Sequence, residues 1–339
     1  MPGTGWAERY LGGSKEAEDR LIEDWARRIE VVQRKLATAN GRPLRALHAK
    51  AAAVVRASLR ILPDGELDRA ELAAAGFTGP LPAPLRAGLL APGQVFDDVV
   101  VRFSNASGSL AADSAKDMRG VAVRVTPPSG RVQDLLMTNM AASFARDPEQ
   151  QIGVTEANAL SANRLTMIAR LFAKFGPSEA VRILRTLSAV RPVETLAAEE
   201  FWSRAPFAVG PHAVKFKLQP RQAPEPSGVD PSPDYLYEDL KTRLATSALT
   251  YDLRLQFFDG EPTTPIEDGT VAWPTPFVTF GALVIPPQDL DSPDLGRLRA
   301  EIERTGFSPA HNETFTGIGS LNRARAKVYW ADQRARGVT

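Results

Sequence analysis

The sequence contains no cysteine and only three histidines among its 339 residues. Without cysteine, a disulfide framework, a thiolate zinc site, an iron–sulfur cluster and a cysteine nucleophile are excluded. The histidines, His48, His212 and His311, form neither an HxxxH nor an HExxH pair, so the helical zinc motifs are absent. We therefore set a histidine-based metal site aside.

The sequence also lacks an excess of one charge and a long apolar run. Lysine and arginine number 41, and aspartate and glutamate number 40. This balance gives no long-range field that would favour nucleic acid or an anionic membrane. Nowhere do eighteen apolar residues follow one another, and the first twenty residues do not resemble a signal peptide. We therefore expect a soluble, cytoplasmic protein that binds neither nucleic acid nor membrane.

The hydrophobic pattern alternates between a helical period and a strand period. Ser14 is a candidate N-cap for a surface helix whose apolar stripe recurs at three and four residues, at Leu21, Trp25, Ile29, Val32 and Leu36. Strand-like segments follow, separated by turns rich in proline and glycine, at 48–62, 99–104, 120–126, 133–139, 213–218, 251–258 and 277–285. Two helices interrupt the strands, over 163–176 and 177–187, and a final helix covers 321–336.

These segments predict an α+β fold with antiparallel pairing of the strands. We expect residues 1–40 to form an N-terminal helix and arm, and residues 41–339 to form a single domain. The proline-rich stretch 220–234 resembles a linker in composition. Because strands flank it on both sides, we expect it to be a surface excursion within that domain.

Two segments place polar groups where they need a local partner. In VVVRFSNASG (99–108), Arg102 and Ser104 share one face of the predicted strand. In the final helix, Arg325, Tyr329 and Arg336 share one face. Two neighbouring cations favour a phenolate, which is a hard ligand suited to ferric iron. Taken alone, the pattern around Tyr329 is also typical of a tyrosine that packs its helix against the core beside solvated arginines. His48, taken alone, is also typical of an ordinary core or surface histidine.

Together, four blocks resemble the heme catalase family in their order along the chain. They are RALHAK (45–50), RFSNASG with DMRGVAV (102–108 and 117–123), DLLMTN with FARDP (134–139 and 144–148), and RAKVYWADQRAR (325–336). Weaker similarity continues through GPHAVKFKL (210–218). The resemblance implies an antiparallel β-barrel core with surrounding helices, and heme b as the cofactor.

The resemblance also implies roles for single residues. His48 matches the distal histidine that carries out acid–base chemistry, and Ser104 matches the hydroxyl that hydrogen-bonds its ring. Tyr329 matches the proximal ligand to the iron, as is known for catalases, and Arg325 matches the guanidinium that keeps this tyrosine ionised. On this basis Tyr329 is expected to be the metal ligand.

Further residues match positions around the cofactor. Three cations match those that neutralise the heme propionates, namely Arg45, Arg102 and Arg336. Asp117 matches an acidic residue of the main access channel. The family has an Asn-Asn pair on the distal strand, where this chain has Thr138-Asn139. An ungapped match puts Thr138 at the catalytic position and a shift by one residue puts Asn139 there; we favour Asn139.

Other departures bear on the substrate. Ser143 and the pair Gln151-Ile152 stand where the family has bulky aromatic side chains, which predicts a wider pocket. The segments that interlock a tetramer and bind a nucleotide have no counterpart in this sequence, so we expect no NADPH, and a homodimer is left open. Leu47 beside His48 is apolar, as in catalases rather than in allene oxide synthases.

The resemblance thus implies a heme-dependent peroxidase. It would reduce organic hydroperoxides, hydrogen peroxide or both through a ferryl intermediate, and its partners would be the peroxide and a small electron donor. Three alternatives stay open at this point. They are a true catalase that dismutates hydrogen peroxide, an isomerase of fatty-acid hydroperoxides like the allene oxide synthases, and a protein that binds heme without turnover.

Overall fold

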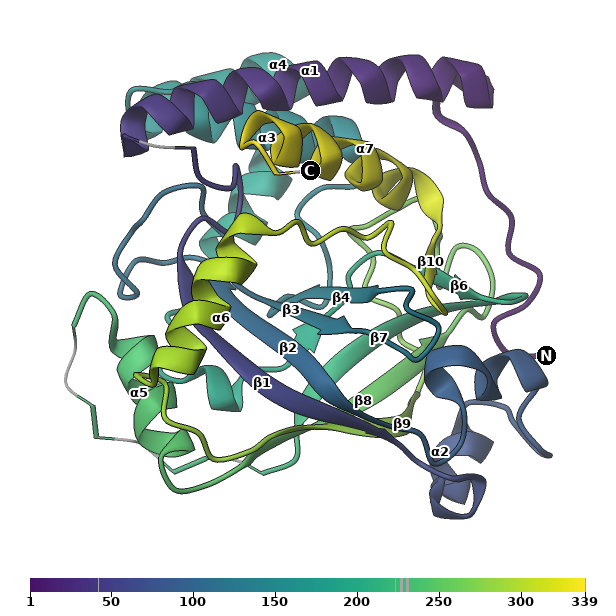
Figure 1. Cartoon of the computed structure of the whole chain (residues 1–339). Helices are drawn as coiled ribbons and strands as arrows, with labels where there is room; N and C mark the ends of the chain where they lie inside the picture. Colours follow the sequence, from purple (N-terminus) through teal and green to yellow (C-terminus); the bar gives the residue numbers. More distant parts are fainter. Residues whose placement is uncertain (42, 223, 226–227, 230–231, 339) are drawn as a thin grey trace.

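Eight antiparallel strands close into a barrel at the centre of the molecule (Figure 1). The computed structural model describes residues 1–41, 43–222, 224–225, 228–229 and 232–338. The strands of the barrel are β1 (Ala51–Ile61), β2 (Val95–Asn105), β3 (Arg119–Val125), β4 (Gln133–Thr138), β5 (Phe201–Trp202), β7 (His212–Pro220), β8 (Leu249–Phe257) and β9 (Phe277–Ile285). They are ordered β7-β5-β4-β3-β2-β1-β9-β8, and pairing of β8 with β7 closes the ring. The predicted α+β fold with an antiparallel β-barrel core is confirmed.

Alternation of side chains along the strands gives the barrel its two faces. One set of apolar residues packs together in the barrel core, for example Phe103, Phe201 and Phe216. Two short strands extend the sheet beyond β7, namely β6 (Phe207–Val209) and β10 (Thr316–Gly317). The proline-rich excursion 220–234 lies between β7 and the helix that precedes β8, and its residues 223, 226–227 and 230–231 lie outside the described part of the chain.

Four helices form a layer that covers one side of the barrel (Figure 1). They are α1 (Lys15–Asn40), α3 (Pro148–Leu160), α4 (Arg164–Ser188) and α7 (Gly319–Ala335). Within this layer α1 packs on α7 and α3, and α3 packs on α4. The remaining helices are α2 (Arg69–Ala74), α5 (Tyr235–Leu244) and α6 (Pro293–Arg304), of which α5 and α6 contact β1.

Helix α1 differs in detail from the prediction, and α4 agrees with it. In α1, Ser14 caps the helix as expected, but Ile22 is buried while Leu21 is 39% exposed. The buried stripe of α1 therefore starts one residue later than predicted, because Ile22, and not Leu21, falls on the same face as Trp25 and Ile29. The two helices expected over 163–187 are both present within α4, and the break between them falls where predicted, because Gly176 adopts a non-helical backbone before Pro177.

The sequence patterns located the long strands to within a few residues but did not predict α2, α3, α5 or α6. No helix in the described part of the chain is long and apolar enough to cross a membrane.

Candidate functional site

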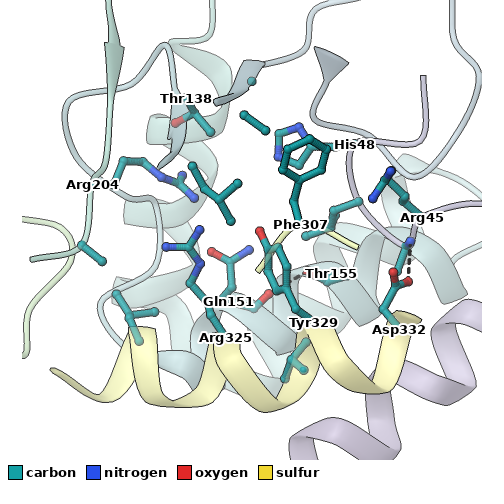
Figure 2. A pocket seen from close by; sticks show the side chains of 18 of the residues that line it. Arg45, His48, Thr138, Gln151, Thr155, Arg204, Phe307, Arg325, Tyr329 and Asp332 are labelled. Atoms are coloured by element: carbon teal, nitrogen blue, oxygen red, sulfur yellow. Dashed lines mark hydrogen bonds between the residues drawn. The ribbon is translucent and has the colours of Figure 1, made fainter. Parts of the chain in front are cut away.

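A cavity lies between the barrel and the helices α3 and α7 (Figure 2). The space between its atoms, including the open mouth, amounts to about 1360 Å³. Eight of the ten candidate residues line it, although they come from distant parts of the chain: Arg45, His48, Arg102, Ser104, Thr138, Arg325, Tyr329 and Arg336. The fold thus brings together most of the residues that the sequence singled out.

Two rows of residues across β2, β3 and β4 form the barrel side of the cavity. The strand register aligns Ser104, Gly120 and Thr138 in one row. It aligns Arg102, Ala122 and Leu136 in the next row, and all six residues line the cavity. Because β3 contributes a glycine and an alanine to these two rows, the longer side chains of β2 and β4 on either side have room to project toward the helices.

His48 is held in this wall by its neighbours on all sides. Its Nδ1 shares a hydrogen bond of 3.0 Å with Ser104 Oγ, and its backbone N–H donates to the carbonyl oxygen of Ala106. Its φ angle is 58°, in the left-handed region that few residues other than glycine adopt. Strained backbone of this kind is concentrated at functional sites, where the surroundings impose it.

The electrostatic surroundings keep the His48 imidazole neutral. Burial, together with the charges of Arg102, Arg204 and other arginines, lowers the pKa of His48 to about 3. A positive charge on the ring would be poorly solvated and repelled by these cations. At neutral pH the ring is therefore a neutral base that faces a cavity rich in guanidinium groups.

Gly120 provides the space that the His48 ring occupies. A Cβ at this position would lie 2.4 Å from Cε1 and 2.5 Å from Nδ1 of His48. We expect Gly120→Ala to displace the ring and to lower the free energy of unfolding by about 1–3 kcal/mol, as is typical of overpacking. Denaturant unfolding measures this effect, with Gly65→Ala as the control because a Cβ at Gly65 meets nothing within 4 Å. If the Gly120→Ala and Gly65→Ala variants are equally stable, Gly120 is not needed to leave space for the His48 ring.

Tyr329 extends from α7 on the opposite side of the cavity from His48 (Figure 2). The Arg325 guanidinium, one helical turn earlier, lies 5.5 Å from the centre of the Tyr329 ring, and it donates a 3.0 Å hydrogen bond to Asn322 Oδ1. Arg336 caps the end of α7 and donates to Asp332 Oδ2 at 3.0 Å. Asp332 also accepts a hydrogen bond from the backbone N–H of Ala46, which ties the segment before His48 to α7.

The arginines at one end of the cavity share a carboxylate from α6. Arg102 Nε donates to Glu303 Oε1 at 2.7 Å, and Arg45 Nε lies 3.7 Å from Glu303 Oε2. Burial alone would raise the pKa of Glu303, but the charge and hydrogen bond of Arg102 hold it below its usual value. Burial, followed by the charge of Arg102, lowers the pKa of Arg45 to about 9. Arg45 is therefore ionised at neutral pH, and the Glu303 carboxylate lies between the two arginines as their shared counter-ion.

Comparison with known proteins gives one informative result. No family model matches the sequence, and no curated protein matches it. Among solved structures, catalase A from Saccharomyces cerevisiae superposes with a TM-score of 0.65 at 16% sequence identity. The superposition covers 98% of this chain and 68% of the yeast chain. The chain has a catalase-like fold. At this level of identity the similarity establishes the fold alone. The chemistry has to be inferred from the residues of the site.

Within this catalase-like fold, four buried polar atoms of the cavity lining have no hydrogen-bond partner among the described residues. They are Arg45 Nε, Thr138 Oγ1, Arg204 Nη1 and Arg336 Nη2. Buried polar groups are almost always hydrogen-bonded. Seven further atoms of this kind lie elsewhere in the described residues. Three of the four in the cavity belong to guanidinium groups, which suit a ligand that carries negative charge.

Two of the candidate residues lie away from the cavity lining. Asn139, which we favoured for the distal position, donates through Nδ2 to Glu199 Oε2 and accepts from the backbone N–H of Arg119. Thr138, the last residue of β4, lines the cavity, whereas the next residue, Asn139, does not. Asp117 accepts a hydrogen bond from the backbone N–H of Ser107, and burial raises its pKa.

The cavity also contains residues that the sequence patterns did not single out. Arg204 projects into it from the segment that follows β5 (Figure 2). Arg204 and His48 are the two non-glycine residues with a positive φ angle in the described part of the chain, each at 58°. Phe307 follows α6 and packs beside Arg45, 5.8 Å from its guanidinium. Arg204 lies in a segment with no clear period, so a pattern of hydrophobic residues could not have found it.

Proposed function

We propose that this protein is a heme-dependent peroxidase that reduces an organic hydroperoxide or hydrogen peroxide with electrons from a small donor. The observation that carries the proposal is the pairing of a neutral imidazole, His48, with a phenol, Tyr329, on opposite walls of one cavity. A histidine base and a tyrosine ligand on two sides of a heme are the arrangement that the sequence resemblance implies. The catalase-like fold supports this reading at the level of architecture.

The side chains of the cavity fit heme b. Arg45, Arg102 and Arg336 would hold the two propionates, and two of these guanidinium groups carry a nitrogen without a hydrogen-bond partner. Apolar side chains of the cavity lining, such as Leu136 and Val328, would contact the ring. Tyr329 would supply the oxygen ligand to the iron. Bound there, heme would supply the redox chemistry that side chains lack.

His48 would supply the proton transfer. As a neutral base it can accept the proton of the hydroperoxyl group and return it to the oxygen that leaves when the O–O bond breaks. Ser104 orients the ring through the bond to Nδ1. In sum, a hydroperoxide, two electrons from the donor and two protons give an alcohol and water.

The distal wall favours a substituted peroxide over hydrogen peroxide. Ser143, Gln151 and Ile152 line the cavity where the family has bulky aromatic groups. Thr138 lines it where the family has an amide that orients the peroxide. Positioning contributes strongly to catalysis, and a misplacement of about an ångström can cost ~10²-fold in rate. The oxygen-evolving reaction of catalases, which needs a second, well-oriented hydrogen peroxide, should suffer most.

A stopped-flow comparison of cumene hydroperoxide with hydrogen peroxide tests the proposal. We expect the heme-loaded protein to oxidise a phenolic donor rapidly with cumene hydroperoxide and to release oxygen from hydrogen peroxide only slowly. Rapid oxygen release without a donor would instead identify a true catalase. Consumption of a fatty-acid hydroperoxide with neither donor nor oxygen release would identify an isomerase, and heme binding without turnover would identify a carrier or sensor.

A further inference from the structure

Arg204 is held in the cavity wall by a rigid segment between β5 and β6. Its neighbours Ser203 and Ala205 are both buried, and Ser203 Oγ donates to the carbonyl oxygen of Ala205. The Ser203 hydroxyl also accepts a hydrogen bond from the backbone N–H of Phe216 in β7. These contacts hold Arg204 at a φ angle of 58°, which L side chains rarely adopt. The fold thus imposes a strained backbone that directs this side chain into the cavity (Figure 2).

The guanidinium of Arg204 has no carboxylate partner among the described residues. Its Nη1 is buried without a hydrogen bond, and no carboxylate lies within ion-pair distance of it in that part of the chain. The neighbouring Arg325 likewise bonds to a neutral amide, Asn322, and to no carboxylate. At the other end of the cavity, by contrast, Arg102 pairs with Glu303 and Arg336 with Asp332.

Arg204 remains a cation despite its burial. Burial, followed by the charge of Arg325, lowers the pKa of Arg204 to about 10. At neutral pH the cavity therefore contains a partly buried charge that Arg325 repels and that Tyr329 attracts when its phenol is ionised. Buried charges are normally paired, and a planar guanidinium matches the two oxygens of a carboxylate. The hydroxyl of Thr138, whose Oγ1 is also unpartnered, lies at the same end of the cavity.

We propose that Arg204 binds a carboxylate group on the substrate, so that the preferred peroxide is an organic hydroperoxide that also carries an acid group. The inference rests on the proposed function in taking the ligand to be a peroxide. A heme propionate is the competing source of a carboxylate. It is disfavoured because Arg45 lies across the cavity from Arg204 (Figure 2), and Arg102 and Arg336 are close to Arg45. Arg204 thus discriminates among substrates and is not required for heme binding.

Two substitutions separate the charge of Arg204 from its structural role. Arg204→Gly removes the guanidinium and relieves the positive φ angle, so this variant should fold at least as well as the wild type. Arg204→Lys keeps the charge but loses the planar fork. Arg20→Gln removes an exposed arginine of α1 that lies outside the cavity and serves as the control.

Binding is measured by calorimetry with the para-carboxy derivative of cumyl alcohol and with its methyl ester, on both heme-loaded and heme-free protein. We expect Arg204→Gly to raise the dissociation constant of the acid by about 10- to 100-fold, the range for loss of a charge-assisted hydrogen bond. Arg204→Lys should lie between this variant and the wild type. Binding of the ester, and heme affinity, should stay unchanged in all variants.

The kinetic arm compares cumene hydroperoxide with its para-carboxy derivative. We expect the wild type to have a higher kcat/KM for the para-carboxy peroxide than for cumene hydroperoxide. Arg204→Gly should lose this difference because its KM for the para-carboxy peroxide rises. If the wild type reduces both peroxides with the same kcat/KM, the inference is overturned and the proposed function stands. Acid binding that depends on Arg204, in a protein that reduces neither peroxide, would support the carboxylate site and overturn the proposed function. Reduced heme affinity in Arg204→Gly would assign Arg204 to a propionate and overturn the inference.

Discussion

Tyr329→Phe is expected to lower the affinity for heme by more than about 100-fold and to abolish the phenolate-to-iron charge-transfer absorption. The change removes one oxygen atom from the wall of the cavity that faces His48. Loss of groups that merely support a metal ligand commonly costs 10–100-fold in metal affinity, so loss of the ligand itself should cost more. With no cysteine in the chain and His48 on the opposite wall, the variant retains no comparable ligand on the Tyr329 side.

Titration of heme-free protein with hemin, followed by absorption, measures both effects. Tyr237→Phe is a matched control, because the Tyr237 hydroxyl hydrogen-bonds Asp291 and the carbonyl oxygen of Leu290 and does not line the cavity. It should bind heme as the wild type does. If the Tyr329→Phe variant keeps an unchanged heme spectrum, the proximal assignment is wrong.

The parts of the site that the sequence predicted are those that lie on regular elements. Arg102 and Ser104 were found because a polar pair interrupts an apolar strand, and Tyr329 because cations recur at helical spacing around it. The period of a strand or helix fixes which face such residues share. The barrel then brings them within one cavity because β2 and β3 pair in a register that aligns Ser104 with Gly120.

The parts that the sequence could not predict depend on contacts between distant segments. Glu303 pairs with Arg102 across 201 positions of the chain, and nothing in the sequence near either residue indicates this pair. Arg204 points into the cavity because the backbone N–H of Ser203 donates to the carbonyl oxygen of Phe216 in a neighbouring strand. Asn139 was preferred over Thr138 on resemblance, yet its amide is engaged by Glu199 and Arg119. Local sequence patterns could not predict these features because they depend on tertiary contacts. This holds for the ion pair, for the strained segment and for the direction of the side chain at the strand end.

His48→Ala is expected to leave heme binding intact and to lower the rate of reaction with peroxide by ~10²–10⁴-fold, the usual contribution of general acid–base catalysis. The reason is that the neutral ring is held by Ser104 beside the cavity as a proton acceptor. Because its pKa is about 3, the wild-type rate should stay constant between about pH 8 and pH 5 as far as this group controls it. An unperturbed histidine would instead become protonated near pH 6.5.

The same pKa has a consequence for stability that can be measured without heme. Between pH 6.5 and pH 3 the unfolded chain binds a proton at His48 that the folded protein does not. The free energy of unfolding should therefore fall as the pH decreases through this range, and it should fall less steeply in His48→Ala. The companion variant His48→Asn tolerates the positive φ angle and separates loss of the base from backbone strain. Both variants should show the same rate defect. Loss of heme together with activity in both would show that His48 has a ligating or structural role, because an acid–base group is not needed to hold the cofactor.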